Sequence, residues 1–209
     1  MPGCPYFLAN TFGHLLGGLI LTGISTEHPI VSNLEKKPIT GLVGVLFTFA
    51  ILVAISFSEP GPFKYIAFAF FCLTLGQILS GFVKRLKQEQ VLSSTLILVG
   101  TIFVSMTVVG FLDKGNMLSL ESYLYAGLLG LIVATIGVAL FAKPSEAGKL
   151  NRWLTWFVVI LFTLFVGYDV QVLKEHAKQC KSNPDYVQES INLYLDFLNL
   201  FQGVGSLEK

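Results

Sequence analysis

The sequence predicts an all-α multi-pass membrane protein, a bundle of seven transmembrane helices in a single domain over residues 1–209. Hydrophobic residues make up 53% of the chain and charged residues only 13%, whereas a soluble domain contains about 25% charged residues. The mean hydropathy is +0.69. Apolar runs of helix length recur along the chain, and each is close to the ~20 residues that a membrane-spanning helix needs. Lipid is therefore the expected solvent.

The expected helices differ in how strongly the sequence supports them. Four apolar runs contain no charged residue or histidine: 38–58, 65–83, 91–112 and 122–142. Two further runs carry one ionisable residue each, since 5–26 contains His14 and 153–173 contains Asp169. The seventh segment, 186–207, mixes polar and apolar residues. It is predicted to be semi-polar, and either central or re-entrant.

Short connections separate these helices and leave no room for a soluble domain. They are expected at 59–62, 84–87, 113–116, 143–152 and around the breaker Ser182-Asn183-Pro184. Trp153 and Trp156 mark the headgroup level at the start of the sixth span, because indole rings prefer that level. On the fifth helix, the ridge of Ala126, Gly130 and Ala134 permits close backbone contact and predicts a central position.

Basic residues favour one orientation. No cleavable signal peptide is evident, so the first helix is expected to remain. Loops one, three and five and the C-terminal tail hold Lys36, Lys37, Lys84, Arg85, Lys87, Lys143, Lys149, Arg152 and Lys209. The opposite side holds Lys64, Lys114, Lys174, Lys178 and Lys181. Positive-inside counting therefore places the N-terminus outside if the seventh helix spans completely.

Several classes of function lack their sequence signatures. Cys4, Cys72 and Cys180 lie far apart, and their odd number argues against a full disulfide framework. The sequence contains no zinc motif, phosphate-binding loop or nucleophile elbow. Its net charge of +1 gives no indication of nucleic-acid binding. The chain is expected not to be an enzyme and to need no cofactor.

Two acidic residues dominate the functional interpretation. Asp169 and Asp196 lie at similar distances on either side of the breaker at 182–184. In an antiparallel helical hairpin, a rise of about 1.5 Å per residue puts both carboxyls roughly 20 Å from the turn. Acids at matching depth in a membrane indicate a functional site, because an isolated carboxylate is costly in hydrocarbon. Alternatively, Asp169 simply accepts hydrogen bonds from Tyr168, Gln171 or a neighbouring helix.

The seventh helix carries a polar stripe that extends this site. Its members step by three or four residues and share one face: Glu189, Asn192, Asp196, Asn199 and Gly203. Carboxylate and amide oxygens suit Ca²⁺, so the stripe indicates a cation pathway. The alternative is an interfacial amphipathic helix that faces headgroups. Two close carboxylates in low dielectric cannot both ionise cheaply, so the pair is expected to share a proton and respond to pH.

The C-terminal residues resemble the transmembrane Bax inhibitor motif family. The resemblance rests on Gly167-Tyr168-Asp169-Val170-Gln171, on Asn183-Pro184-Asp185-Tyr186-Val187 and on residues 192–201. Looser similarity at 15–22, 63–65 and Gly76 extends it over essentially the whole chain. It implies seven helices, a pH-sensitive Ca²⁺ leak and, in eukaryotes, suppression of cell death. The family's paired aspartates fall on Asp169 and Asp196.

One departure from the family pattern affects gating. Members place a basic residue on the second helix as a partner for the acidic pair, whereas 38–58 contains none. His14, on a face with Asn10, Gly18 and Thr22, either takes that part or packs between helices as a hydrogen-bonding residue. A long basic C-terminal tail is not seen in this sequence.

The resulting hypothesis is a pH-modulated Ca²⁺ leak channel. Asp169 and Asp196 form the ion-binding and proton-sensing pair, with Asn192, Asn199, Glu189 and His14 as auxiliary groups. The alternatives are a non-conducting membrane protein that binds cell-death regulators or other channels, and a proton-coupled exchanger. The expected partners are the lipid bilayer, Ca²⁺ and protons. The expected location is the endoplasmic reticulum or Golgi of a eukaryote, or the cell membrane of a bacterium.

Overall fold

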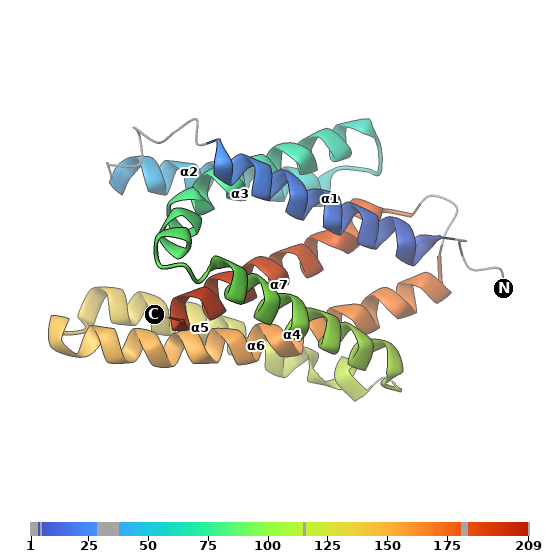
Figure 1. Cartoon of the computed structure of the whole chain (residues 1–209). Helices are drawn as coiled ribbons and strands as arrows, with labels where there is room; N and C mark the ends of the chain where they lie inside the picture. The colour runs from blue at the N-terminus through green and yellow to red at the C-terminus, as the bar shows by residue number, and fades with distance from the viewer. Residues whose placement is uncertain (1–3, 5, 29–37, 115, 181–183, 209) are drawn as a thin grey trace. The chain divides into compact units, whose positions relative to one another are not determined.

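The computed structural model describes residues 4, 6–28, 38–114, 116–180 and 184–208, and these residues are almost entirely helical (Figure 1). The helices are α1 (Phe7–Glu27), α2 (Pro38–Phe57), α3 (Pro62–Gln88), α4 (Leu92–Leu112), η1 (Asn116–Leu120, a 3₁₀-helix), α5 (Glu121–Phe141), α6 (Pro144–Lys178) and α7 (Tyr186–Leu207). The predicted all-α fold is therefore confirmed. Outside the described residues lie Lys36, Lys37, Gly115, Lys181, Ser182, Asn183 and Lys209.

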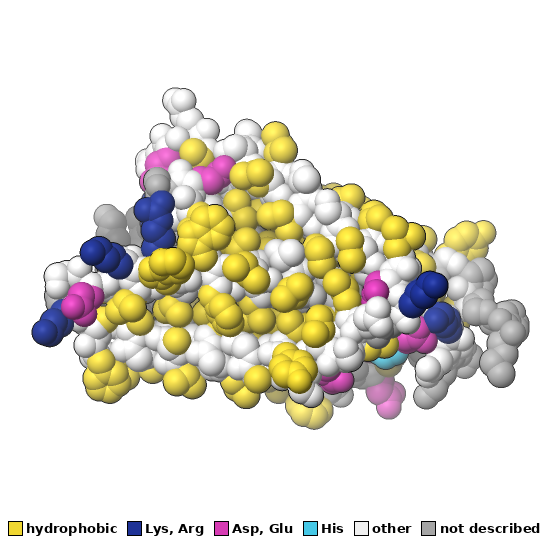
Figure 2. Space-filling model, turned by 90° about the horizontal axis from the view of Figure 1, so that it is seen from below, with side chains coloured by type: hydrophobic (Ala, Val, Ile, Leu, Met, Phe, Trp, Pro, Cys, Tyr) yellow, Lys and Arg dark blue, Asp and Glu magenta, His cyan; other side chains and the backbone are white. Residues whose placement is uncertain are grey.

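Five of these helices are long and apolar enough to cross a membrane. They are α1, α3, α4, the run of η1 and α5, and α6. The apolar part of α2 over Val43–Phe57 is shorter, and α7 is not among the five, in line with its semi-polar sequence. Large apolar side chains are exposed on the helices, and hydrophobic groups cover much of the face in Figure 2. Such surfaces need lipid, so the chain is an integral multi-pass membrane protein.

Two helices extend further than the sequence predicted. α3 begins at Pro62 and continues to Gln88, so residues 84–87 are helical and do not form the expected loop. The extra turns bury Leu86 completely. They also suit the sequence there, because Lys and Arg are good helix formers. α6 likewise starts at Pro144, within the predicted connection. Proline is well tolerated in the first turn of a helix, where its missing N–H costs nothing.

The chain divides into two compact units. The first contains Met1–Gln88 and Ala177–Tyr194, and the second contains Glu89–His176 and Leu195–Lys209. Both α6 and α7 contribute residues to each unit.

In the first unit, α1 packs closely against α3 through small residues. A Cβ atom added at Gly76 would lie 2.5 Å from the carbonyl oxygen of Thr22, and one at Gly18 would lie 2.9 Å from the ring of Phe68. Tyr194 of α7 is fully buried there, and its hydroxyl hydrogen-bonds the hydroxyl of Thr22. The absence of side chains at the two glycines therefore sets the spacing of these helices.

A buried ion pair joins two segments of the same unit. Lys64, in the first turn of α3, is only 2% exposed, and its ammonium binds the carboxylate of Asp185 just before α7. It also donates to the carbonyl oxygen of Ser58 at 3.0 Å. In the sequence, Lys64 is only one of the expected loop charges, and nothing there predicts this pair.

The predicted central position of α5 is wrong. Only Leu124 and Leu131 of this helix are buried. Gly130, in the middle of the predicted ridge, has no neighbouring atom within 4 Å of an added Cβ position. Small residues permit a close contact but do not require one: Gly130 makes none in the described residues, whereas Gly127 on the same helix lies against Leu161 of α6.

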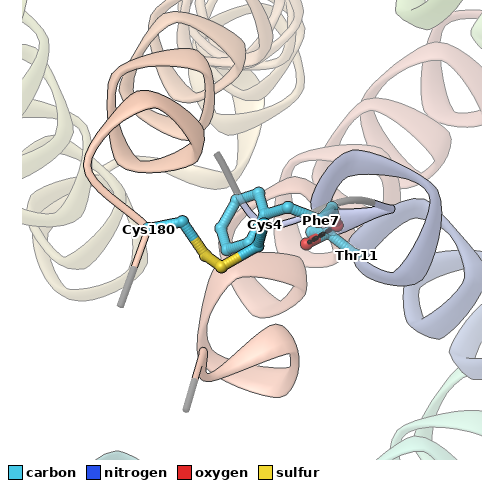
Figure 3. Close-up of a disulfide and its surroundings, with 4 residues drawn as sticks. All are labelled: Cys4, Phe7, Thr11 and Cys180. Carbon is cyan, nitrogen blue, oxygen red and sulfur yellow. Dashed lines mark hydrogen bonds between the residues drawn. A yellow bond between two sulfur atoms is a disulfide. The ribbon is translucent and has the colours of Figure 1, made fainter. Parts of the chain in front are cut away.

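A disulfide joins Cys4, before α1, to Cys180, after α6, across 176 residues of sequence (Figure 3). The sequence does not predict this bond, because two cysteines so far apart give no signal for pairing. The bond places the N-terminal segment and the connection after α6 on the same side of the membrane. Disulfides persist in oxidising compartments, which favours the predicted outside location of the N-terminus. Cys72 is free and buried.

We expect a membrane-impermeant maleimide to modify no cysteine in the folded, non-reduced protein. Cys4 and Cys180 are bonded to each other and Cys72 is fully buried. After mild reduction, intact-mass measurement should show two modified thiols. Cys4→Ser should expose one reactive thiol without reductant, whereas Cys72→Ser should leave the pattern unchanged. Modification of Cys4 in the untreated protein would contradict the bond.

Candidate functional site

The second unit brings together the two acidic residues singled out in the sequence. Asp169 lies on α6 and is half-buried, whereas Asp196 lies on α7 and is only 4% exposed. Their side chains lie within hydrogen-bonding reach of each other and interact electrostatically. The arrangement is therefore a carboxyl pair between two adjacent helices.

The chemistry of the pair follows from its donors and acceptors. Two carboxylates are acceptors only, so a hydrogen bond between Asp169 and Asp196 requires a proton on one of them. The Oδ2 atom of Asp196 is buried and has no N–H or O–H donor among the described residues. A proton shared by the two carboxyls would supply the missing donor. The charge of the pair consequently depends on whether it holds no, one or two protons.

Aromatic side chains surround this part of the unit. The ring of Tyr125 on α5 lies 5.8 Å from that of Phe165, one turn before Asp169 on α6. Tyr125 also interacts electrostatically with both aspartates and with Glu121. On α7, Phe197 packs edge-on against Phe103 of α4 at 5.6 Å. The pair thus lies in a largely apolar environment, where charge interactions are stronger than in water.

Glycines allow the helices that carry the pair to pack closely. A Cβ atom added at Gly110 of α4 would lie 2.7 Å from the carbonyl oxygen of Gly167 on α6 and 2.9 Å from Val170. One added at Gly203 of α7 would lie 2.8 Å from Val159 of α6. The contact with α4 involves residues that flank Asp169, whereas the contact with α7 lies nearer the start of α6, at Val159.

A polar cluster anchors α6 just beyond the pair. Gln171 is 2% exposed, donates its amide to Asp113 and accepts from the backbone N–H of Leu118 at 3.2 Å. Lys174 donates to the carbonyl oxygens of Phe111 and Asp113 at 2.8 and 3.0 Å. The sequence suggests Gln171 as a hydrogen-bond partner of Asp169, whereas its side chain bonds Asp113 at the end of α4 and Leu118 of η1. The cluster therefore orients α6.

The auxiliary residues of the predicted stripe have different environments. Asn199 is half-buried and donates its amide to the carbonyl oxygen of Leu195 at 2.8 Å. Asn192 is exposed and Glu189 is half-buried, and both belong to the first unit. Within the second unit, the pair and Asn199 are the predicted site residues present. The ligand roles of the stripe stay predictions.

His14 also belongs to the first unit, where it packs among aromatic rings. Its Nδ1 atom lies 2.8 Å from the carbonyl oxygen of Asn10. Its imidazole stacks against Tyr65 at 5.3 Å and Tyr186 at 5.9 Å. These contacts support the helix-packing interpretation of His14.

No group of three or more His, Cys, Asp or Glu side chains that would hold a metal ion occurs in the part of the chain that the structure describes. Ca²⁺ takes 6–8 oxygen ligands in its resident sites. The carboxyl pair supplies only a fraction of that number, so by itself it does not form a resident Ca²⁺ site.

Comparisons with known proteins cover nearly the whole chain. The family model described as Inhibitor of apoptosis-promoting Bax1 matches residues 5–206. An uncharacterized protein of Borreliella burgdorferi is 29% identical over 93% of this chain and 88% of its own. Bax inhibitor 1 of Schizosaccharomyces pombe is 25% identical over 93% and 73%, respectively. Inner membrane protein YbhL of Escherichia coli is 28% identical over 53% and 48%.

We expect Gly110→Ala to destabilise the second unit, because the new methyl group would meet backbone atoms of α6 that cannot move cheaply. Overpacking of this kind costs about 1–3 kcal/mol. The measurement is the thermal unfolding midpoint of the detergent-solubilised protein. Gly100→Ala on the same helix is the matched control, since its Cβ atom meets nothing within 4 Å. Equal midpoints for the two variants would contradict the close contact of α4 and α6.

Proposed function

The chain belongs to the Bax inhibitor-1 family, and we propose that it is a pH-sensitive Ca²⁺ leak channel whose cation site is the carboxyl pair of Asp169 and Asp196. Family membership supports a membrane protein that suppresses cell death. The Ca²⁺ leak is a more specific proposal than family membership gives. The observation that carries it is the buried contact between two acids on apolar helices.

Burial explains why the pair suits a conducted ion. An intramembrane acid is costly unless it serves a function or finds a partner, and Asp196 has only another acid as its hydrogen-bond partner in the described structure. A structural role would be met better by an amide or hydroxyl, which forms neutral hydrogen bonds. A negative charge shared by two carboxyls attracts a cation without enclosing it, which favours passage over retention.

Protons and Ca²⁺ compete for the same oxygens. At high pH the pair carries more negative charge and binds Ca²⁺ more tightly. As pH falls, protonation of Asp169 or Asp196 removes that charge, and the affinity for Ca²⁺ falls with it. Glu121 of α5 is a further acid near the site, since it and both aspartates interact electrostatically with Tyr125. The proposal therefore requires that Ca²⁺ flux depend on pH.

We expect Ca²⁺ entry into proteoliposomes containing the purified protein to change with pH, and Asp169→Asn and Asp196→Asn each to abolish that dependence. An asparagine keeps the size and a hydrogen bond but cannot take up a proton in this range. The measurement is the fluorescence of a Ca²⁺ indicator trapped in the vesicles. Glu146→Gln is the matched control, because it makes the same acid-to-amide change at an exposed position of α6.

The same assay separates the alternatives. A non-conducting protein that binds cell-death regulators or other channels would give no flux above empty vesicles at any pH. A proton-coupled exchanger would transport Ca²⁺ only when a pH gradient drives it, whereas a leak also runs at equal pH on both sides. An unchanged pH response in both aspartate variants would remove the carboxyl pair from the mechanism.

A further inference from the structure

A hollow of about 290 Å³ lies on the early turns of α6 and is lined by Lys149, Arg152, Trp153 and Trp156. The spacing of these four residues is i, i+3, i+4 and i+7, so they share one face of the helix. None of them takes part in the carboxyl pair or its surroundings. The hollow combines two cations with two large aromatic rings.

The two indole rings are exposed to an unusual degree. Trp153 is 75% exposed and Trp156 is 51% exposed. In water such rings would be costly surface, but at the headgroup level of a membrane their apolar bodies and N–H groups are both satisfied. The exposed face continues along α6 through Phe157 and Ile160, which are also exposed. The hollow therefore opens onto an apolar strip that faces lipid.

The position of the cations matches the phosphate level of a bilayer. The apolar part of α6 begins at Trp153, and Lys149 lies one turn before it. From Lys149 to Trp156 the helix rises by about 10 Å, close to the depth of an interfacial region. Lys149 and Arg152 therefore lie outside the hydrocarbon, with the indole rings at its edge.

The charge of the hollow is uncompensated in the described structure. Neither Lys149 nor Arg152 belongs to an ion pair between described residues such as that of Lys64 with Asp185 or of Lys87 with Glu27. Two cations one turn apart attract an anion, and an arginine fork binds phosphate oxygens in a bidentate manner.

We propose that this hollow binds the phosphate group of an anionic phospholipid. Lys149 and Arg152 contact the phosphate, Trp153 and Trp156 contact the glycerol region, and an acyl chain lies along Phe157 and Ile160. A soluble phosphate would use the cations alone and leave the indole rings and the apolar strip without a role. The combination of charge and continuous apolar surface selects a lipid as the occupant.

The chain offers a direct reporter for this site, because it contains only two tryptophans and both line the hollow. We expect brominated phosphatidylglycerol to quench the tryptophan fluorescence of the reconstituted protein at lower mole fraction than brominated phosphatidylcholine, by on the order of tenfold. The host vesicles are made of unlabelled phosphatidylcholine. Equal quenching by the two lipids would overturn the proposal.

Variants test whether the cations provide the preference. The double substitution Lys149→Gln and Arg152→Gln should remove the preference for phosphatidylglycerol while leaving quenching by phosphatidylcholine intact, which also shows that the tryptophans still meet lipid. Lys84→Gln with Arg85→Gln removes the same two charge types from the exposed end of α3 and should keep the preference. Retention of the preference in the first variant would overturn the proposal.

Competition distinguishes lipid from soluble phosphate. Millimolar inorganic phosphate or glycerol phosphate, at constant ionic strength, should leave the quenching by phosphatidylglycerol unchanged, because neither occupies the apolar strip. Displacement of the lipid by these soluble anions would overturn the assignment to a lipid and indicate a site for free phosphate.

Discussion

The buried contact between Asp169 and Asp196 is the constraint on which the packing of α6 and α7 depends. Neither carboxyl tolerates isolation in an apolar environment, and the Oδ2 atom of Asp196 has no other donor among the described residues. The helices must therefore stay close enough for the acids to meet. Gly203 permits that approach, because any side chain at its position would collide with Val159 of α6.

Local patterns in the sequence predicted the helices and the two acids, but not the contacts that depend on distant residues. The length of an apolar run directly predicts a membrane-spanning helix. The positions of Asp169 and Asp196, at similar distances from a helix breaker, predict similar depths in a helical hairpin. The extensions of α3 and α6 were missed because charged residues at helix ends look like loop residues. The bond of Cys4 to Cys180 and the pair of Lys64 with Asp185 join segments more than 100 residues apart, for which one sequence gives no signal.

The error over α5 has the same origin. A small-xxx-small ridge allows two backbones to approach but does not specify a partner. The glycines that make close contacts in the second unit are Gly110, Gly127, Gly167 and Gly203, and no regular repeat in the sequence sets them apart. What distinguishes them is the presence of another helix at van der Waals distance, which is a property of the fold. Gly130 belongs to a small-xxx-small pattern, but it is exposed and has no neighbouring helix within contact distance in the described residues.

The two ends of α6 carry different chemistry, and both point to the same orientation. Its N-terminal turns hold the basic and aromatic hollow, whereas its C-terminal end leads to Cys180 and the disulfide. A helix of 35 residues is roughly 50 Å long, enough to reach both interfaces. Basic residues remain on the cytoplasmic side and disulfides persist on the oxidising side. The distribution of charge and the disulfide thus both favour the predicted orientation, in which the N-terminus lies outside.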